Sequence, residues 1–221
     1  MKEISPGVYR RGRQLFTRSI IRGYAAFTKS VVTVDGAEYR EWDPTKSKPA
    51  AAIVRGLKNF PLGKGQKVLY LGAASGATCS FFSDIVGEDG AIYAVEFSER
   101  SAMDLNITSE KRGNIIPILA DARKPEQYEW VEPVDILFED VASDDQSAIL
   151  IRNAEMFLKP EGVAMIAIKA RSIDVVKDPR QVYREQLEML GKRFTILEKL
   201  ELDPYEKDHM FVVLSQKKHS S

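Results

Sequence analysis

The sequence predicts an α/β fold in which seven strands form a mostly parallel, doubly wound sheet. Two observations carry this prediction. Apolar runs rich in Val, Ile and Tyr recur after Pro61, and segments of helical period lie between most of them. A glycine-containing turn also follows the first run, which is where sheets of this kind bind nucleotide-like ligands.

The predicted strands and helices alternate along the chain. The seven strands are Lys67 to Leu71, Ala91 to Val95, Ile115 to Leu119, Val134 to Phe138, Val163 to Ile168, Phe194 to Leu200 and Met210 to Leu214. The helices between them are Cys79 to Val86, Arg100 to Lys111, Asp145 to Leu158 and Pro179 to Leu190. Only Glu201 to His209 separate the last two strands. Because this link is too short for a crossover helix, we expect the last two strands to pair antiparallel.

Residues before about Asp43 do not follow this alternation. Gly7 to Arg11, Leu15 to Ile21 and Val31 to Trp42 are short segments, and Asp35-Gly36 forms a turn signal within the last of them. We therefore expect a small N-terminal β-hairpin region over residues 1–45 and the main domain over residues 46–221. Pro49 suits the first turn of a helix that runs to Leu57.

Composition excludes several classes of protein. The chain has 221 residues, of which 44% are hydrophobic and 29% charged, with one cysteine and two histidines. These counts exclude a disulfide scaffold and a four-ligand Cys/His zinc module, and we expect no bound metal. We find no apolar run long enough for a membrane helix and no signal-type stretch, so we expect a cytoplasmic protein without membrane contact.

Charge is balanced overall and uneven along the chain. Lys and Arg together number 32, as do Asp and Glu. Residues 1–34 contain seven basic residues and one acid, whereas residues 125–151 contain eight acids and no Lys or Arg. This polarity predicts either a basic end that binds phosphates and an acidic face that binds a basic partner, or two solvated faces.

The turn after the first strand of the sheet discriminates between nucleotide ligands. It runs from Leu71 to Thr78, and Ala74 stands where a dinucleotide fingerprint has its second glycine. This substitution disfavours a bound pyrophosphate. A Walker phosphate loop is excluded because no Gly-Lys-Ser/Thr follows Gly76.

Acidic residues end the next two strands of the predicted sheet. Glu96 stands where a carboxylate accepts both hydroxyls of a ribose, and Asp121 stands where one accepts from an adenine amino group. A ligand with ribose and adenine but no phosphates fits this pattern, and S-adenosylmethionine is such a ligand. The alternative interpretation is that each acid merely ends a strand.

Three further polar residues belong to the same edge of the sheet. Asp140 and Lys169 follow the fourth and fifth strands, and His209 precedes the antiparallel last strand. Because these ends converge on one crevice, the three side chains can meet there. Lys169 leaves a buried strand, a setting that suits either a proton acceptor or a lysine that extends to the surface. His209 is either catalytic or a hydrogen-bonded structural histidine.

The motifs resemble those of fibrillarin in its archaeal form. The matching segments are Val68 to Gly76, Tyr93 to Ser98, Asp121 to Arg123, Asp140 to Ala142, Ile168 to Ala170 and Pro204 to His209, together with Glu38 to Pro44 and Ser47-Lys48. The resemblance covers most of the chain. It implies a Rossmann-like S-adenosylmethionine-dependent methyltransferase fold and transfer of a methyl group to ribose 2′-hydroxyls of rRNA and tRNA.

The resemblance also implies roles for individual residues. The expected catalytic residues are Lys48, Asp140, Lys169 and His209. The expected cofactor-binding residues are Gly72, Ala73, Ala77, Thr78, Glu96, Phe97, Asp121, Ala122, Asp140, Val141, Ala142, Ser143 and Gln146.

Substrate selection is expected to depend on partners. The sequence contains no RNA-recognition motif, RGG tract or zinc knuckle, which argues against sequence-specific RNA binding by this chain alone. The resemblance implies a Nop-family scaffold protein, a kink-turn-binding protein and a box C/D guide RNA that pairs with the substrate RNA. Three alternatives stay open: a methyltransferase of small molecules, a nicotinamide oxidoreductase, and a non-catalytic component of the ribonucleoprotein.

Overall fold

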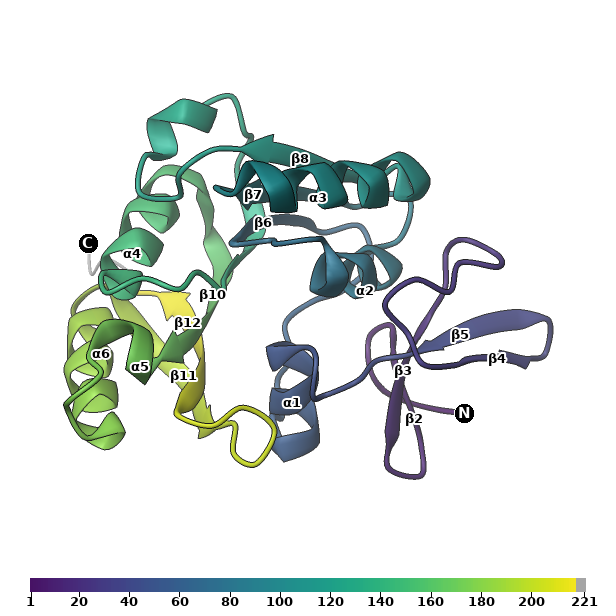
Figure 1. Cartoon of the computed structure of the whole chain (residues 1–221), viewed down its shortest axis with the longest axis horizontal. Coiled ribbons are helices and arrows are strands. Elements are labelled where there is room, and N and C mark those ends of the chain that lie inside the picture. Colours follow the sequence, from purple (N-terminus) through teal and green to yellow (C-terminus); the bar gives the residue numbers. More distant parts are fainter. Residues whose placement is uncertain (218–221) are drawn as a thin grey trace.

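The computed structural model describes residues 1–217 and contains two sheets (Figure 1). The larger sheet has seven strands in the order β11-β12-β10-β9-β6-β7-β8. Their bounds are β6 Lys67–Leu71, β7 Ala91–Glu96, β8 Ile115–Leu119, β9 Val134–Glu139, β10 Leu158–Lys169, β11 Phe194–Glu201 and β12 His209–Gln216. The strands from β10 to β8 pair parallel, whereas β12 is antiparallel to both β10 and β11. The predicted fold class and the antiparallel pairing of the last two strands are confirmed.

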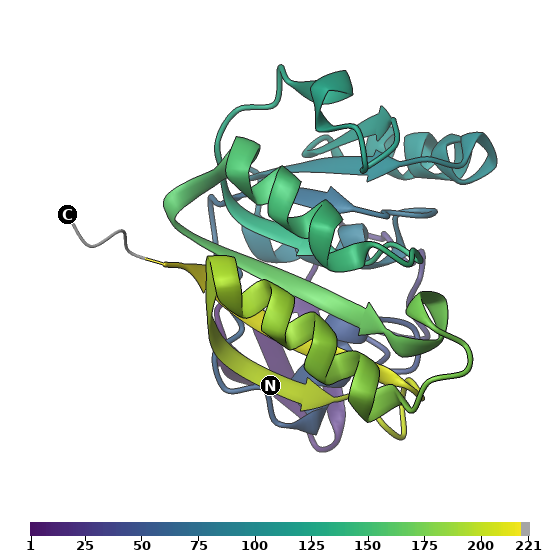
Figure 2. The same cartoon turned by 90° about the vertical axis from the view of Figure 1, so that its left-hand side faces the viewer.

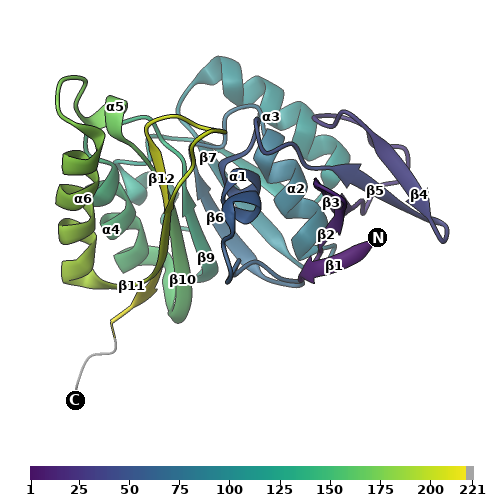
Figure 3. The same cartoon turned by 90° about the horizontal axis from the view of Figure 1, so that it is seen from below.

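Helices cover both faces of this sheet (Figures 2 and 3). Their bounds are α1 Lys48–Arg55, α2 Ala77–Val86, α3 Glu99–Arg112, α4 Gln146–Phe157, α5 Ala170–Ile173 and α6 Pro179–Arg193, with a 3₁₀ turn, η1, at Pro125–Tyr128. On β6, Val68 and Tyr70 face the apolar cluster shared with α1 and α2, while Leu69 and Leu71 face the cluster shared with α4 and α6. This alternation is the two-residue period of a strand buried on both faces.

The N-terminal residues form a five-stranded antiparallel sheet, which is more than the predicted hairpin region. Its strands are β1 Lys2–Ser5, β2 Val8–Arg11, β3 Gln14–Arg18, β4 Val31–Val34 and β5 Ala37–Glu41, in the order β1-β2-β3-β5-β4. Asp35 and Gly36 both have positive φ, as a two-residue type I′ hairpin turn requires. Strand β1 was not expected, because it is a short edge strand whose residues are mostly exposed and show no apolar alternation.

A buried ionic cluster attaches the N-terminal sheet to the larger domain. The Asp84 carboxylate on α2 accepts hydrogen bonds from Thr17 on β3 and Arg40 on β5, each at 2.7 Å, and also pairs with Arg112 at the end of α3. The side chains of Asp84, Arg40 and Arg112 are fully buried. Trp42 stacks on Phe81 of α2 with 5.6 Å between ring centroids. The apolar core is therefore continuous across the predicted boundary near residue 45, and a division into two domains stays a prediction.

Within residues 1–217, no helix is long and apolar enough to cross a membrane.

Candidate functional site

A cavity of about 290 Å³ lies at the carboxyl edge of the larger sheet. Four loops line it, each following one strand. They contribute Gly72 and Ala74 after β6, Val95 to Phe97 at the end of β7, Ala120 to Arg123 after β8, and Asp140 to Ser143 after β9, with Ile149 of α4 behind them. The cavity lies where a doubly wound sheet binds nucleotide-like ligands.

Gly72 allows two of these loops to approach each other closely. Its φ is +81°, and a Cβ at this position would lie 3.0 Å from the backbone carbonyl of Asp140 and from the side chain of Val141. Any larger residue would separate the loop after β6 from the loop after β9 or strain the backbone. The glycine therefore places Asp140 at the wall of the cavity.

The Glu96 carboxylate is held in one orientation by backbone donors. One oxygen accepts from the Ala74 N–H and the other from the Ser98 N–H, each at 2.8 Å. Ala74 has φ +49°, a left-handed conformation that is unfavourable for alanine and that this hydrogen bond stabilises. The carboxylate keeps free lone pairs that face the cavity, where a ribose diol can donate to them.

Asp121, Ala122 and Phe97 form the next part of the wall. Asp121 Oδ1 accepts from the Arg123 N–H at 2.9 Å, which orients the carboxylate at the end of β8. The Phe97 side chain is 74% exposed and lines the cavity, so its ring is available to pack against a ligand. Val141, Ala142 and Ser143 lie opposite, on the loop after β9.

Four residues predicted to contact a cofactor do not line the cavity: Ala73, Ala77, Thr78 and Gln146. The Thr78 hydroxyl donates to Ser47 Oγ at 3.1 Å. The fully buried Gln146 amide donates to Val141 O at 2.7 Å and Ala167 O at 3.1 Å, and accepts from the Lys169 N–H at 2.9 Å. The Gln146 side chain is thus hydrogen-bonded to backbone groups, and these bonds position the two segments that carry Val141 and Lys169. Cofactor contact by these four residues stays a prediction.

Two lysines converge on Asp140 beside the cavity. Lys169 Nζ lies 2.8 Å from Asp140 Oδ1 and also donates to the Asp140 carbonyl oxygen. Lys48 Nζ lies 3.1 Å from the same Oδ1 and donates to Oδ2 at 3.3 Å. All three side chains are less than one-fifth exposed. Asp140 Oδ1 lies within ion-pair distance of both ammonium groups, although the angles at this oxygen do not suit a hydrogen bond to either of them. One carboxylate therefore pairs with two cations.

His209 lies directly across the ladder from Lys169. The two residues are partners in the β10–β12 register. His209 Nδ1 lies 2.7 Å from the Lys207 carbonyl oxygen. Because a carbonyl oxygen only accepts, Nδ1 carries a hydrogen, which leaves Nε2 as the ring nitrogen that can face a ligand. The predicted meeting of Asp140 and Lys169 is observed as an ion pair, with His209 adjacent through the backbone ladder.

Two acidic residues near this cluster were not predicted from the sequence to take part. Glu206, on the loop between β11 and β12, lies 4.0 Å from Lys48 Nζ. Glu139 is fully buried, and neither carboxyl oxygen has a hydrogen-bond partner within the described residues. Burial raises the pKa of Glu139 well above its usual value; the Lys169 charge opposes this rise, and the Asp140 charge adds to it. Burial therefore favours the neutral form of Glu139, next to Asp140.

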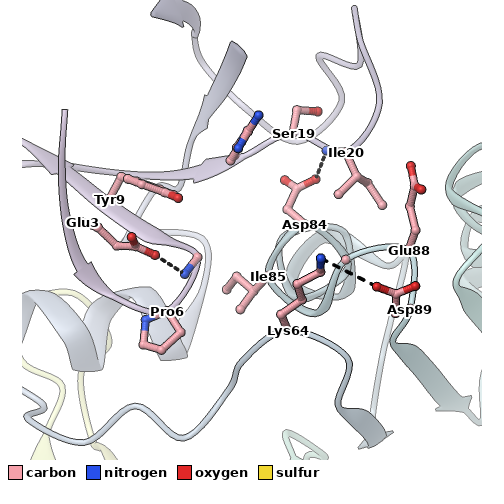
Figure 4. A pocket seen from close by; sticks show the side chains of 13 residues that line it. Glu3, Pro6, Tyr9, Ser19, Ile20, Lys64, Asp84, Ile85, Glu88 and Asp89 are labelled. Carbon is pink, nitrogen blue, oxygen red and sulfur yellow. Dashed lines mark hydrogen bonds and ion pairs between the residues drawn. The ribbon is translucent and has the colours of Figure 1, made fainter. Parts of the chain in front are cut away.

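A larger cavity, of about 550 Å³, is lined by a different set of residues (Figure 4). It is formed between the N-terminal sheet and the carboxyl end of α2, whose amino end faces the β6 loop. Several of its polar groups have partners: Glu3 accepts from the Gly7 N–H, Asp84 accepts from the Ile20 N–H, and Lys64 pairs with Asp89. None of the predicted site residues lines it.

Comparisons with known proteins show which family this chain resembles. A family model described as Fibrillarin matches residues 2–218. A curated fibrillarin-like rRNA/tRNA 2′-O-methyltransferase of Pyrococcus horikoshii is 50% identical over 215 residues, covering 94% of this chain and 95% of the relative. Aeropyrum pernix fibrillarin, solved with natively bound S-adenosyl-L-methionine, superposes with a TM-score of 0.85 at 40% identity, covering 97% of this chain and all of that one. A fibrillarin solved in a fibrillarin/Nop5p complex superposes with a TM-score of 0.89 at 41% identity, covering 98% of this chain and all of that one.

Proposed function

Because this chain belongs to the fibrillarin family, we propose that it transfers the methyl group of S-adenosylmethionine to ribose 2′-hydroxyls of rRNA and tRNA. The observation that carries this function is the Lys48–Asp140–Lys169 cluster beside a cavity walled by Glu96 and Asp121. The cavity suits a ligand with ribose and adenine, and the cluster suits a hydroxyl that must lose a proton. The enzyme activity and the cofactor agree with those named for the relatives.

The residues of the cavity fit the proposed cofactor. Glu96 would accept from the ribose hydroxyls, Asp121 would accept from the adenine amino group, and Phe97 would pack against the base. Gly72 leaves room for close approach of a ligand beside Asp140. The carboxylate of Asp140 would lie near the sulfonium, where opposite charges attract.

Bound S-adenosylmethionine supplies an activated methyl group with a good leaving group, so the chain needs mainly to orient the ribose oxygen and accept one proton. Lys169 would take the proton that the ribose hydroxyl loses as its oxygen attacks the methyl group, and the ammonium so formed would be held by Asp140, which lies 2.8 Å from Lys169 Nζ. Lys48 adds a second cation on the same carboxylate, and His209 Nε2 can face a nucleotide hydroxyl. General-base assistance of this kind contributes roughly 10²–10⁴-fold to the rate.

Selection of the RNA nucleotide is proposed to come from partners. The net charge of the chain is zero, which is weak support for RNA binding without help. A relative has been solved in a complex with Nop5p, and this supports a Nop-family scaffold for this chain. A kink-turn-binding protein and a box C/D guide RNA would complete the assembly. The cytoplasm is the proposed location.

A reconstitution assay tests this function. The chain is incubated with tritiated S-adenosylmethionine, a box C/D guide RNA and a matching target RNA, with and without the Nop-family and kink-turn-binding proteins. We expect one methyl group at the guide-selected 2′-oxygen only in the complete mixture. Methylation of free small molecules at the same rate in every mixture would support a small-molecule methyltransferase instead. If the chain does not bind S-adenosylmethionine, the result would favour a non-catalytic component of the ribonucleoprotein.

A further inference from the structure

Arg123 joins two loops that form opposite walls of the cofactor cavity. It stands on the loop after β8, and its guanidinium donates to Ser143 Oγ at 2.6 Å and to Asp145 Oδ1 at 3.2 Å, on the segment after β9. The Asp144 carboxylate lies 3.8 Å from the same guanidinium. Arg123 and Ser143 both line the cavity, so the link lies at its wall.

The sheet itself does not join these two walls. In the strand order, β6 and β7 separate β8 from β9, and the cavity lies against the loops after β6 and β7. A contact between the β8 loop and the β9 loop therefore spans the cavity from one side to the other. Arg123 also fixes Asp121 through its own N–H at 2.9 Å, so the residue that spans the cavity also orients a cavity carboxylate.

The partners of Arg123 are arranged to receive a guanidinium. Ser143 Oγ lies 2.5 Å from Asp145 Oδ1, which places both acceptors side by side. Burial alone would raise the pKa of Asp145, but hydrogen bonds from Ser143 and Arg123 hold it below its usual value. The planar fork of arginine can donate to two acceptors at once, which the single ammonium of lysine does less well.

The link is also easy to break. The Arg123 and Asp145 side chains are 48% and 36% exposed, and an exposed ion pair contributes little to stability and is screened by salt. Arg152 competes for Asp145, at 3.3 Å from its other oxygen. Loss of this contact at the cavity wall should therefore cost the fold little while it frees two loops that line the cavity.

We propose that Arg123 is a positioning residue that closes the cofactor cavity through Ser143 and Asp145 and sets the rate at which S-adenosylmethionine leaves it. The inference rests on the proposed function only in the identity of the ligand. It assigns to Arg123 a role in cofactor retention, apart from the methyl transfer at Asp140 and Lys169.

Cofactor dissociation tests this role directly. The full chain is loaded with tritiated S-adenosylmethionine, chased with excess unlabelled cofactor, and the bound label is followed at low and at high salt. Arg123→Ala should release the label about two- to fivefold faster than the wild type at low salt, the size expected for an exposed ion pair. High salt should accelerate release from the wild type and leave Arg123→Ala nearly unchanged. Ser143→Ala should show a smaller effect in the same direction.

Arg193→Ala is the matched control, because Arg193 forms an exposed ion pair with Glu155 at 3.0 Å and does not line the cavity. Release from this variant should equal that from the wild type. Equal release rates for Arg123→Ala and the wild type would overturn the proposal, as would equal acceleration in both arginine variants. Failure of the wild type to bind the label at all would instead contradict the proposed function.

Discussion

Glu139 is a buried carboxyl group for which the described residues provide no hydrogen-bond partner. It lies between Leu71 on β6 and Ile166 on β10 in the register of the sheet, one residue before Asp140. A charged carboxylate in such a place is unfavourable, so burial raises the pKa of this group and favours its neutral form. Because folding raises this pKa, the free energy of unfolding depends on pH.

Folding raises the pKa of Glu139, so the folded state binds this proton more tightly than the unfolded chain does. The stabilisation this proton gives is complete below the unfolded pKa and is lost as pH rises toward the folded value. We expect the free energy of unfolding of Glu139→Gln, relative to that of the wild type, to increase as pH rises above the ordinary pKa of glutamic acid toward the raised folded value, with a slope of up to about 1.4 kcal/mol per pH unit. Urea unfolding across this range measures it. A margin that stays constant with pH would show that Glu139 is charged in the fold.

Glu96 is expected to contribute directly to cofactor binding, since its carboxylate is fixed by two N–H donors at the cavity wall. Glu96→Gln should weaken S-adenosylmethionine binding by about 1–1.5 kcal/mol, because a charge-assisted hydrogen bond to the ribose is replaced by a neutral one. Titration calorimetry measures this, with Glu110→Gln on the exposed part of α3 as the control. An unchanged dissociation constant for Glu96→Gln would contradict the proposal that Glu96 binds the ribose hydroxyls.

Some of these residues were predictable from the sequence and others were not. The meeting of Asp140 and Lys169 follows from strand ends that share one edge, which periodicity reveals. The fork from Arg123 to Ser143 depends on loop conformation across strands that are not neighbours, so no sequence spacing indicates it. Gln146 was expected from the family resemblance to contact the cofactor; its amide hydrogen-bonds to three backbone groups, and these contacts depend on the packing of segments that are distant in the sequence.

The elements α2, α3 and β5 are tied together at Asp84, which is the only carboxylate paired with the buried Arg40 and Arg112 among the described residues. Burial lowers the pKa of Arg40, and the Asp84 charge opposes this effect. Asp84→Asn leaves two buried cations without their counter-charge. We expect it to lower the free energy of unfolding by about 3–5 kcal/mol.

Urea unfolding of Asp84→Asn and of Asp89→Asn compares a buried pair with an exposed one. Asp89 lies 3.7 Å from Lys64, and both side chains are more than 70% exposed. Asp89→Asn should change the free energy of unfolding by less than about 1 kcal/mol. Similar losses in the two variants would contradict the role of the buried cluster.

Element positions were predictable where periodicity is strong. The predicted strands at Lys67 to Leu71 and Ile115 to Leu119 have the observed bounds. The short helix α5 and the turn η1 were missed, since four residues carry too little periodicity to detect. Strand β10 begins at Leu158, five residues before the predicted start, because a shift in its pairing with β9 between Leu158 and Val163 interrupts the pattern.

At the scale of the whole molecule, the N-terminal sheet carries a basic surface on the side of the molecule away from α6 (Figure 1). Arg10, Arg11 and Arg13 are exposed on β2 and the following turn, and none forms an ion pair within residues 1–217. We predict that they bind RNA phosphates in the assembled complex. Changing all three to Gln should make RNA binding less salt-dependent, by about 0.7–0.9 in the logarithmic slope for each phosphate that is no longer neutralised.

Filter binding of RNA at several salt concentrations measures this slope. The control variant changes Arg184, Lys192 and Lys199 to Gln, three exposed cations on α6 and β11. It removes the same total charge and should leave the slope near that of the wild type. If both triple variants behave alike, the N-terminal cations act through net charge and bind no phosphate locally.

The central claim is that Lys169 and Asp140 act together on a ribose hydroxyl. The most direct measurement is the single-turnover rate of methylation by Lys169→Ala in the assembled complex, at saturating cofactor and RNA. We predict a loss of roughly 10²–10⁴-fold with cofactor affinity retained, and little further loss when Asp140→Ala is added. Lys159→Ala is the control, because Lys159 pairs with Asp135 at 2.6 Å at the opposite end of the same strand. A rate for Lys169→Ala near that of the wild type and of Lys159→Ala would contradict the mechanism and leave Lys169 a structural residue.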